Sequence, residues 1–156
     1  MVIESQTDDA VHSFGSTMTG MQQNALLNQI VVDLGCSLLQ FVGEVSPWTP
    51  IGAVAARETL AKLVAKQRQH VDRLVDLLVD RRWPVDFGIY PAEFTDLHFL
   101  SLKSLLPRVI ASQATLVSEL SDLAVRSRDD AEAAAAMVDI LAGERVLTEE
   151  LKSLKL

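Results

Sequence analysis

The sequence predicts an all-α protein, an antiparallel four-helix bundle with one long crossover between the second and third helices. The composition favours helices over sheets, because the chain is 49% hydrophobic while aromatics are only 5% and glycines number only 7 in 156 residues. Four segments carry apolar residues at steps of three and four, the spacing of a buried helix face. Two of the three links between these segments are short, so the helices they join must run antiparallel, and the middle link is long.

The first helix is predicted near residues 19–46 and ends before Pro47, which lacks an amide hydrogen and disfavours helical geometry in the residue before it. Its apolar stripe consists of Leu27, Ile30, Val31, Leu34, Leu38, Phe41 and Val45. Residues 1–18 are rich in Ser, Thr, Asp and Gly, which predicts a flexible N-terminal arm. The bundle is then one domain over residues 19–156.

The second helix is predicted near residues 50–81, with Thr49 as its cap and Pro50 at its first position. Its stripe consists of Leu60, Leu63, Val64, Gln67, His70, Val71, Leu74, Leu77 and Leu78. The link at 82–95 is long for a compact domain and is predicted to be the crossover. We expect its aromatic residues to pack against the bundle; they are Trp83, Phe87, Tyr90 and Phe94.

The third helix is predicted near residues 96–126, and Pro107 is expected to kink it or to split off a short leading helix. Its stripe consists of Val109, Ile110, Gln113, Leu116, Val117, Leu120 and Leu123. The fourth helix is predicted near 130–154, where Asp129 and Asp130 provide a cap and negative charge at a helix start. Its stripe consists of Ala134, Met137, Leu141, Glu144, Leu147 and Leu151.

Four polar residues interrupt these apolar stripes: Gln67, His70, Gln113 and Glu144. Because the stripes face the centre of the bundle, all four side chains are predicted to converge there. Buried polar groups need hydrogen-bond partners, and an imidazolium beside a carboxylate would satisfy both groups. The sequence therefore predicts a buried polar network.

The order Gln67-x-x-His70, Gln113 and Glu144-x-x-Leu147, together with the long crossover, resembles the ferritin-like family over residues 20–154. A two-metal bundle of that family has Glu-x-x-His on two helices and a lone Glu on each of the others. The resemblance implies that Gln67 stands where a bridging carboxylate would be and that His70 matches an imidazole ligand. It also implies that Gln113 replaces a lone glutamate, and that Leu147 replaces the histidine of the second motif.

The chain departs from that pattern in its ligands. The first helix offers no glutamate in its central turns, since Asp33 and Gln40 are predicted off the stripe and Glu44 lies near the end. One carboxylate and one imidazole cannot balance two divalent ions, so no metal and no other cofactor is expected. The alternative is a weak site for one iron, manganese or zinc ion at His70 and Glu144, and a different pocket is a third possibility.

Other motifs exclude several classes of function. A net charge of −7 argues against a nucleic-acid surface. No phosphate-binding Gly-rich loop, Ser/His/Asp set or zinc spacing is present, so no catalytic residue is predicted.

Cys36 has no partner for a disulfide and is predicted to be buried filler. We expect His12 and His98 to be solvated, and Trp48 and Trp83 to close the ends of the core.

These features favour a non-catalytic structural or interaction protein over an enzyme. The first alternative is a ferritin-like metal-binding or oxidative-stress protein with a reduced single-metal site, and the second is a helical adaptor that binds a peptide in a groove. No signal peptide or membrane-length apolar run is visible, which predicts a cytoplasmic protein without a membrane partner. A homodimer is predicted from apolar residues off the main seam, namely Val32, Leu39, Val75 and Val79.

Overall fold

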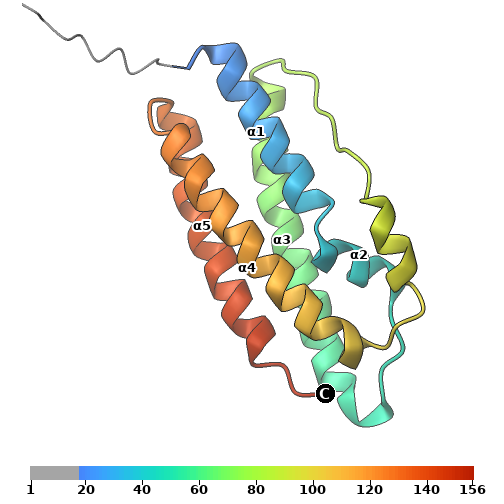
Figure 1. The fold of residues 1–156 in the computed structure, drawn as a ribbon. Coiled ribbons are helices and arrows are strands. Elements are labelled where there is room, and N and C mark those ends of the chain that lie inside the picture. The colour runs from blue at the N-terminus through green and yellow to red at the C-terminus, as the bar shows by residue number, and fades with distance from the viewer. Residues whose placement is uncertain (1–17) are drawn as a thin grey trace, which may run out of the picture.

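The protein is all-α, as predicted. The computed structural model describes residues 18–156, and within that range it contains five α-helices, two short 3-10 helices and no strand (Figure 1). The arm predicted at residues 1–18, apart from its last residue, lies outside the described residues, and so does His12.

The first predicted helix is in fact two helices, which corrects the expected span of 19–46. α1 covers Gly20–Gly35 and begins with a capping box between Thr19 and Gln22. α2 covers Leu38–Val45, and its N-cap is Ser37, whose hydroxyl accepts a hydrogen bond from the backbone N–H of Gln40. A serine cap in the middle of an apolar stripe offers the backbone a second helix start, and this explains why the helix breaks there.

The next helix, α3, covers Val54–Asp80 and therefore begins later than the predicted residue 50. A 3-10 helix, η1, occupies Ile51–Ala53 before it. Thr49 does not cap either helix, because its hydroxyl donates to the Pro47 carbonyl at 3.0 Å. Thr49 and Pro50 thus belong to the turn before η1, and α3 begins only after that 3-10 helix.

The crossover spans residues 81–101 and includes the 3-10 helix η2 at Ala92–Leu97. α4 follows at Leu102–Arg126 and is capped by Ser101, so it begins six residues after the predicted start. α4 runs through Pro107 without a break, and no leading α-helix is split off there. Pro107 lies exposed in the second turn, as does Lys103 four residues before it, so the carbonyl that loses its partner faces water.

α5 covers Ala131–Lys152, close to the predicted span of 130–154. As predicted, Asp130 is its N-cap and accepts a hydrogen bond from the Ala133 amide. The same carboxylate receives two hydrogen bonds from Arg81, at 2.6 and 2.8 Å, which fasten the end of α3 to the start of α5.

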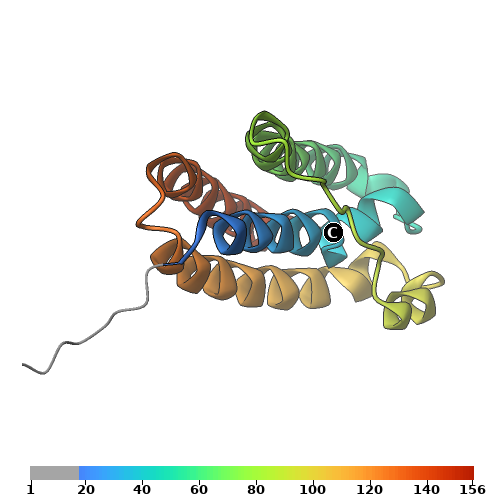
Figure 2. The ribbon, with the colours of Figure 1, turned by 90° about the horizontal axis from the view of Figure 1, so that it is seen from above.

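The helices pack as two antiparallel pairs, α1 with α3 and α4 with α5, and the crossover descends along the outer side of the molecule, beside α1 (Figure 1). Viewed from above, α1 lies between α3 and α4 (Figure 2). α3 and α4 both run from the lower to the upper end of the molecule in Figure 1, so they are parallel. A short link between them could not return the chain to the lower end, which is why the crossover is long.

Within residues 18–156, no single helix is both long enough and apolar enough to cross a membrane. The bent pair formed by α1 and α2 meets the length and composition criteria only when the two are joined. Most of the apolar side chains of this pair are buried against other helices.

Candidate functional site: a polar layer between two apolar clusters

The core of the molecule is divided into two apolar clusters, and a layer of polar side chains lies between them. One cluster contains Leu74 and Leu78 of α3, and the other contains Leu60 and Leu63 of the same helix. Gln67 lies between these two pairs in the chain. α4 and α5 are divided in the same way, by Gln113 and Glu144 respectively, and the α1–α2 break contributes Ser37. The α1–α2 segment, α3, α4 and α5 thus all contribute polar side chains at the same level.

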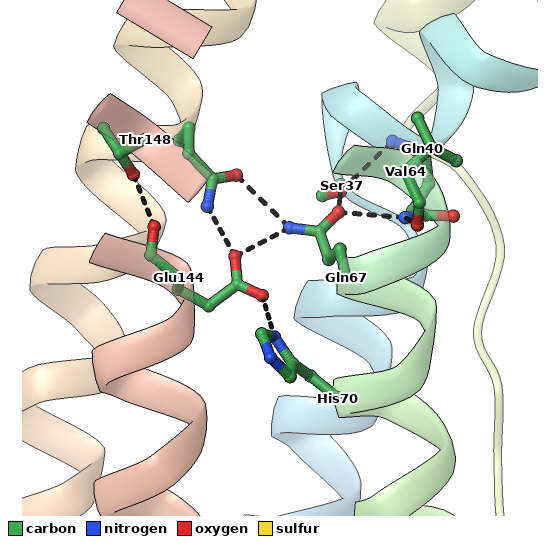
Figure 3. Close-up of polar contacts among 8 residues, drawn as sticks. Ser37, Gln40, Val64, Gln67, His70, Glu144 and Thr148 are labelled. Carbon is green, nitrogen blue, oxygen red and sulfur yellow. Dashed lines mark hydrogen bonds and ion pairs between the residues drawn. The ribbon is translucent and has the colours of Figure 1, made fainter. Parts of the chain in front are cut away.

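Gln67 is the centre of the layer and uses its whole hydrogen-bonding capacity (Figure 3). Its Oε1 accepts from Ser37 Oγ at 2.8 Å and from Gln40 Nε2 at 3.1 Å. Its Nε2 donates to Gln113 Oε1 at 3.2 Å and to Glu144 Oε2 at 3.0 Å. The side chain is fully buried, so each of these bonds replaces one that water would otherwise provide.

Glu144 is also fully buried, and both of its carboxylate oxygens have partners. Oε2 accepts from the amides of Gln67 and Gln113, the latter at 2.5 Å, and Oε1 lies 2.5 Å from His70 Nδ1. Thr148, one turn later, donates its hydroxyl to the Glu144 backbone carbonyl at 2.7 Å. An unpaired carboxylate here would be costly, and the contacts with Gln67, Gln113 and His70 offset that cost.

His70 occupies the outer end of the layer, between α3 and Gly143 of α5. Its side chain is 16% exposed, whereas that of Glu144 is 0% exposed. The other edge of the ring lies against Gly143, where an added Cβ would come within 2.6 Å of Nε2. Gly143 is therefore the residue that makes room for the imidazole beside Glu144.

The orientation of the three amides is fixed by a backbone carbonyl. Val64 O can only accept, and it takes a hydrogen bond from Gln40 Nε2 at 3.0 Å. Gln40 must therefore present its second N–H to Gln67 Oε1, which leaves the Gln67 N–H groups to face Gln113 and Glu144. Reversing any amide would set two donors or two acceptors against each other. The side-chain N–H groups of Gln67 and Gln113 therefore both point at the Glu144 carboxylate.

The structure brings together the four residues singled out in the sequence, and it adds three that were missed: Ser37, Gln40 and Thr148. Gln40 was predicted off the stripe because one continuous helix was assumed through 19–46. The break at Ser37 starts a new helix and turns Gln40 inward, where it is only 2% exposed. The serine cap, followed three residues later by Gln40, was the available signal.

The donor set does not fit a dinuclear metal centre. Among residues 18–156, no group of three or more His, Cys, Asp and Glu side chains is placed to hold a metal ion. The layer offers one carboxylate and one imidazole, and these two groups, Glu144 Oε1 and His70 Nδ1, are bound to each other. Oε2 is occupied by amide hydrogens, whose positive ends face the place a cation would take.

Cys36 differs from its predicted role as buried filler. It is half-buried, and its Sγ donates to the Phe87 carbonyl of the crossover at 3.3 Å. Burial raises the pKa of the thiol, and the neighbouring carboxylates Asp33 and Asp86 raise it further. The sulfur is therefore held as a neutral thiol, which is a poor nucleophile.

The aromatic predictions hold in part. Trp83 packs against the core, but Trp48 is 70% exposed and does not close an end of it. Tyr90 and Phe94 of the crossover pack with Phe41 of α2, whereas Phe87 is 59% exposed. His98 is exposed, as expected.

The residues on which the predicted dimer face was based do not form one. Leu39 is 2% exposed, and Val32 lies under Gly88 of the crossover. Val75 is partly buried against the core, and only Val79 is largely exposed, at 58%. The division of the first helix explains the error for Leu39, because the new helix turns that face inward.

The chain matches no protein-family model, and comparisons with curated proteins and with solved structures found no match.

Proposed function

We propose that this chain is a ferritin-like four-helix bundle that has no metal chemistry and acts as a non-catalytic structural or interaction protein. The arrangement of two antiparallel pairs joined by a long crossover supports the ferritin-like assignment. The single observation that carries the functional proposal is the complete hydrogen bonding of Gln67, which stands where a bridging carboxylate would be and commits its N–H groups to Gln113 and Glu144.

In this proposal the polar layer specifies how the helices align. A slip of α3 by one turn against α4 or α5 would remove Gln67 from Gln113 and Glu144 and leave several buried groups unpaired. The two apolar clusters by themselves would tolerate such a slip better, because one leucine can take the place of another in the core with a small loss of stability. Buried polar groups fix register in this way in coiled coils.

The proposed interaction is self-association through the outer face of α5. Val138 and Val146 are 66% and 50% exposed, and the exposed alanines Ala135 and Ala142 lie in line with them at steps of three and four. A two-fold pairing of this face would cover the valines of both copies.

Metal content tests the absence of a metal site. Protein purified without chelator should contain far less than one transition-metal ion per chain, and added Mn²⁺, Fe²⁺ or Zn²⁺ should leave its thermal midpoint unchanged. The double variant Gln67→Glu, Gln113→Glu would place three carboxylates and His70 together, and its melting temperature should rise when Zn²⁺ or Mn²⁺ is added. The variant Glu149→Gln, on the exposed surface of α5, is the control for nonspecific metal effects.

Stoichiometric metal in the unaltered protein, lost in the His70→Ala variant, would overturn the proposal in favour of the single-metal alternative.

Association has its own test, the mass measured by light scattering. Val138→Glu with Val146→Glu should reduce a dimer to a single chain, whereas Val125→Glu, at an exposed valine of α4, should not. A single-chain mass for the unaltered protein at micromolar concentration would overturn the dimer.

A further inference from the structure

A cleft next to the polar layer opens between α1, α4 and the crossover. Its volume is about 400 Å³, which is in the range of small-molecule sites. Its walls are mainly apolar, formed by Val32, Leu38, Ile89, Phe94 and Leu116. Ser37 lines the same cleft, so the cleft lies directly beside one end of the polar layer.

The charge of the cleft has one sign. Asp33 and Glu119 are its carboxylates, and none of the lining residues in the described part of the chain is Lys, Arg or His. The C-terminal end of α1 also reaches it, and the last turn of that helix has no basic residue to balance the negative end of its dipole. Three sources of negative potential thus meet beside an apolar wall.

Within residues 18–156, Asp33 forms no ion pair with a Lys, Arg or His side chain. Gln29 donates to its Oδ1 at 2.7 Å, one turn earlier on α1. Burial nevertheless raises the pKa of this carboxyl, because the amide only partly replaces the lost water. A positive charge in the cleft would supply the interaction that Asp33 does not obtain from the protein.

The crossover forms a fixed wall on the side of α1. Asn28 holds its backbone with two hydrogen bonds, donating to Asp86 O at 3.1 Å and accepting from Asp86 N at 2.9 Å. Cys36 Sγ binds the next carbonyl, that of Phe87. Gly88, at φ +67°, lets the backbone turn closely against Val32. The cleft is therefore held open by contacts that do not depend on a ligand.

We infer that this cleft binds a small organic cation, an ammonium group attached to an apolar body. The ammonium would lie between Asp33 and Glu119, and the apolar part would cover Ile89, Phe94 and Leu116. An anion would meet all three sources of negative potential, and a neutral apolar molecule would gain no charge interaction with Asp33 or Glu119.

Binding of 2-phenylethylamine tests the inference, with 2-phenylethanol and phenylacetate as neutral and anionic controls of similar shape. In ¹H–¹⁵N spectra of the full chain, the amine should shift amides of residues 32–38, 89–94 and 112–119 in a saturable manner. The alcohol should bind at least about tenfold more weakly, and phenylacetate should not bind. Equal shifts with amine and alcohol, or amine shifts confined to other residues, would overturn the inference.

Variants locate the two halves of the site. Asp33→Asn and Glu119→Gln should each weaken amine binding by about three- to tenfold and leave the alcohol unaffected. Ser112→Phe should fill the cleft and abolish binding of both. Glu150→Gln, an exposed carboxylate on α5, is the control and should change nothing. Unchanged affinity in both carboxylate variants, or no saturable amine binding up to about 10 mM, would show that the cleft is not a cation site.

Discussion

Gly143 and His70 share a space that only glycine leaves open. A Cβ at position 143 would lie 2.6 Å from His70 Nε2 and 2.7 Å from its Cε1, which is closer than real Cβ atoms approach. The imidazole is held in that space by the hydrogen bond from its other side to Glu144. Gly143 of α5 thus leaves the space in which the His70 side chain of α3 reaches the polar layer.

Gly143→Ala should therefore destabilise the protein by about 1–3 kcal/mol, because the ring must leave Glu144 or the helices must separate. Alanine normally favours a helix over glycine, so the sign is the opposite of the propensity effect. Urea unfolding measures the difference. Gly35→Ala, at the end of α1 where an added Cβ meets nothing within 4 Å, is the control and should be neutral or stabilising. An equal response of the two variants would contradict the close contact with His70.

Glu144→Gln should be tolerated better than Glu144→Leu. The new amide keeps an oxygen for the Gln67 and Gln113 donors, and its N–H group can face His70 Nδ1 in the other neutral tautomer. Leucine leaves those donors unpaired, which should cost about 2–5 kcal/mol, against about 1–2 kcal/mol for glutamine. Thermal melts of both variants at one pH give the comparison. Equal melting temperatures would show that the carboxylate is solvated.

Acid should weaken the Arg81–Asp130 connection. The Arg81 guanidinium holds the pKa of Asp130 below its ordinary value of 3.8, so the pair contributes its full stability above that value. The contribution is lost as the pH falls through the lowered pKa of the folded state. Asp130→Asn keeps the cap but removes the charge, and it should cost about 1–2 kcal/mol at pH 7.

The measurement is the free energy of unfolding of both proteins from pH 7 to pH 2, in which the difference should shrink below about pH 4. Asp129→Asn, at the exposed neighbouring position, should show a smaller difference at neutral pH. A difference for Asp130→Asn that does not vary with pH would assign the effect to the cap alone.

Gly88→Ala should loosen the crossover. At φ +67° an alanine is strained, and its Cβ would lie 2.6 Å from Val32 Cγ1. The expected cost is about 1–3 kcal/mol, and amide hydrogen exchange should increase at residues 85–91 more than in α4 or α5. Gly52→Ala, which has nothing within 4 Å of an added Cβ, is the control. Uniform loss of protection over the whole chain would place the strain elsewhere.

The helical content and most of the inward-facing residues were predictable from the sequence. Stripes of apolar residues must be buried, and the spacing of Leu60, Leu63, Leu74 and Leu78 permits only one face of a helix. The same periodicity identified Gln67, Gln113 and Glu144 as inward-facing, because each falls on a stripe. The cap at Asp130 followed from local chemistry, which acts within one turn and does not depend on the rest of the fold.

What the sequence by itself determined is thus the all-α class and the faces that the three long helices α3, α4 and α5 bury. Only the tertiary structure decided that Ser37 divides the first helix, since the local pattern contains both a continuous apolar stripe and a serine cap signal, and these predict different helices. The break turns Gln40 and Leu39 inward, and Gln40 then fixes the direction of the Gln67 amide. Contacts between helices far apart in the chain select among local alternatives of similar energy, and periodicity along one helix carries no information about them.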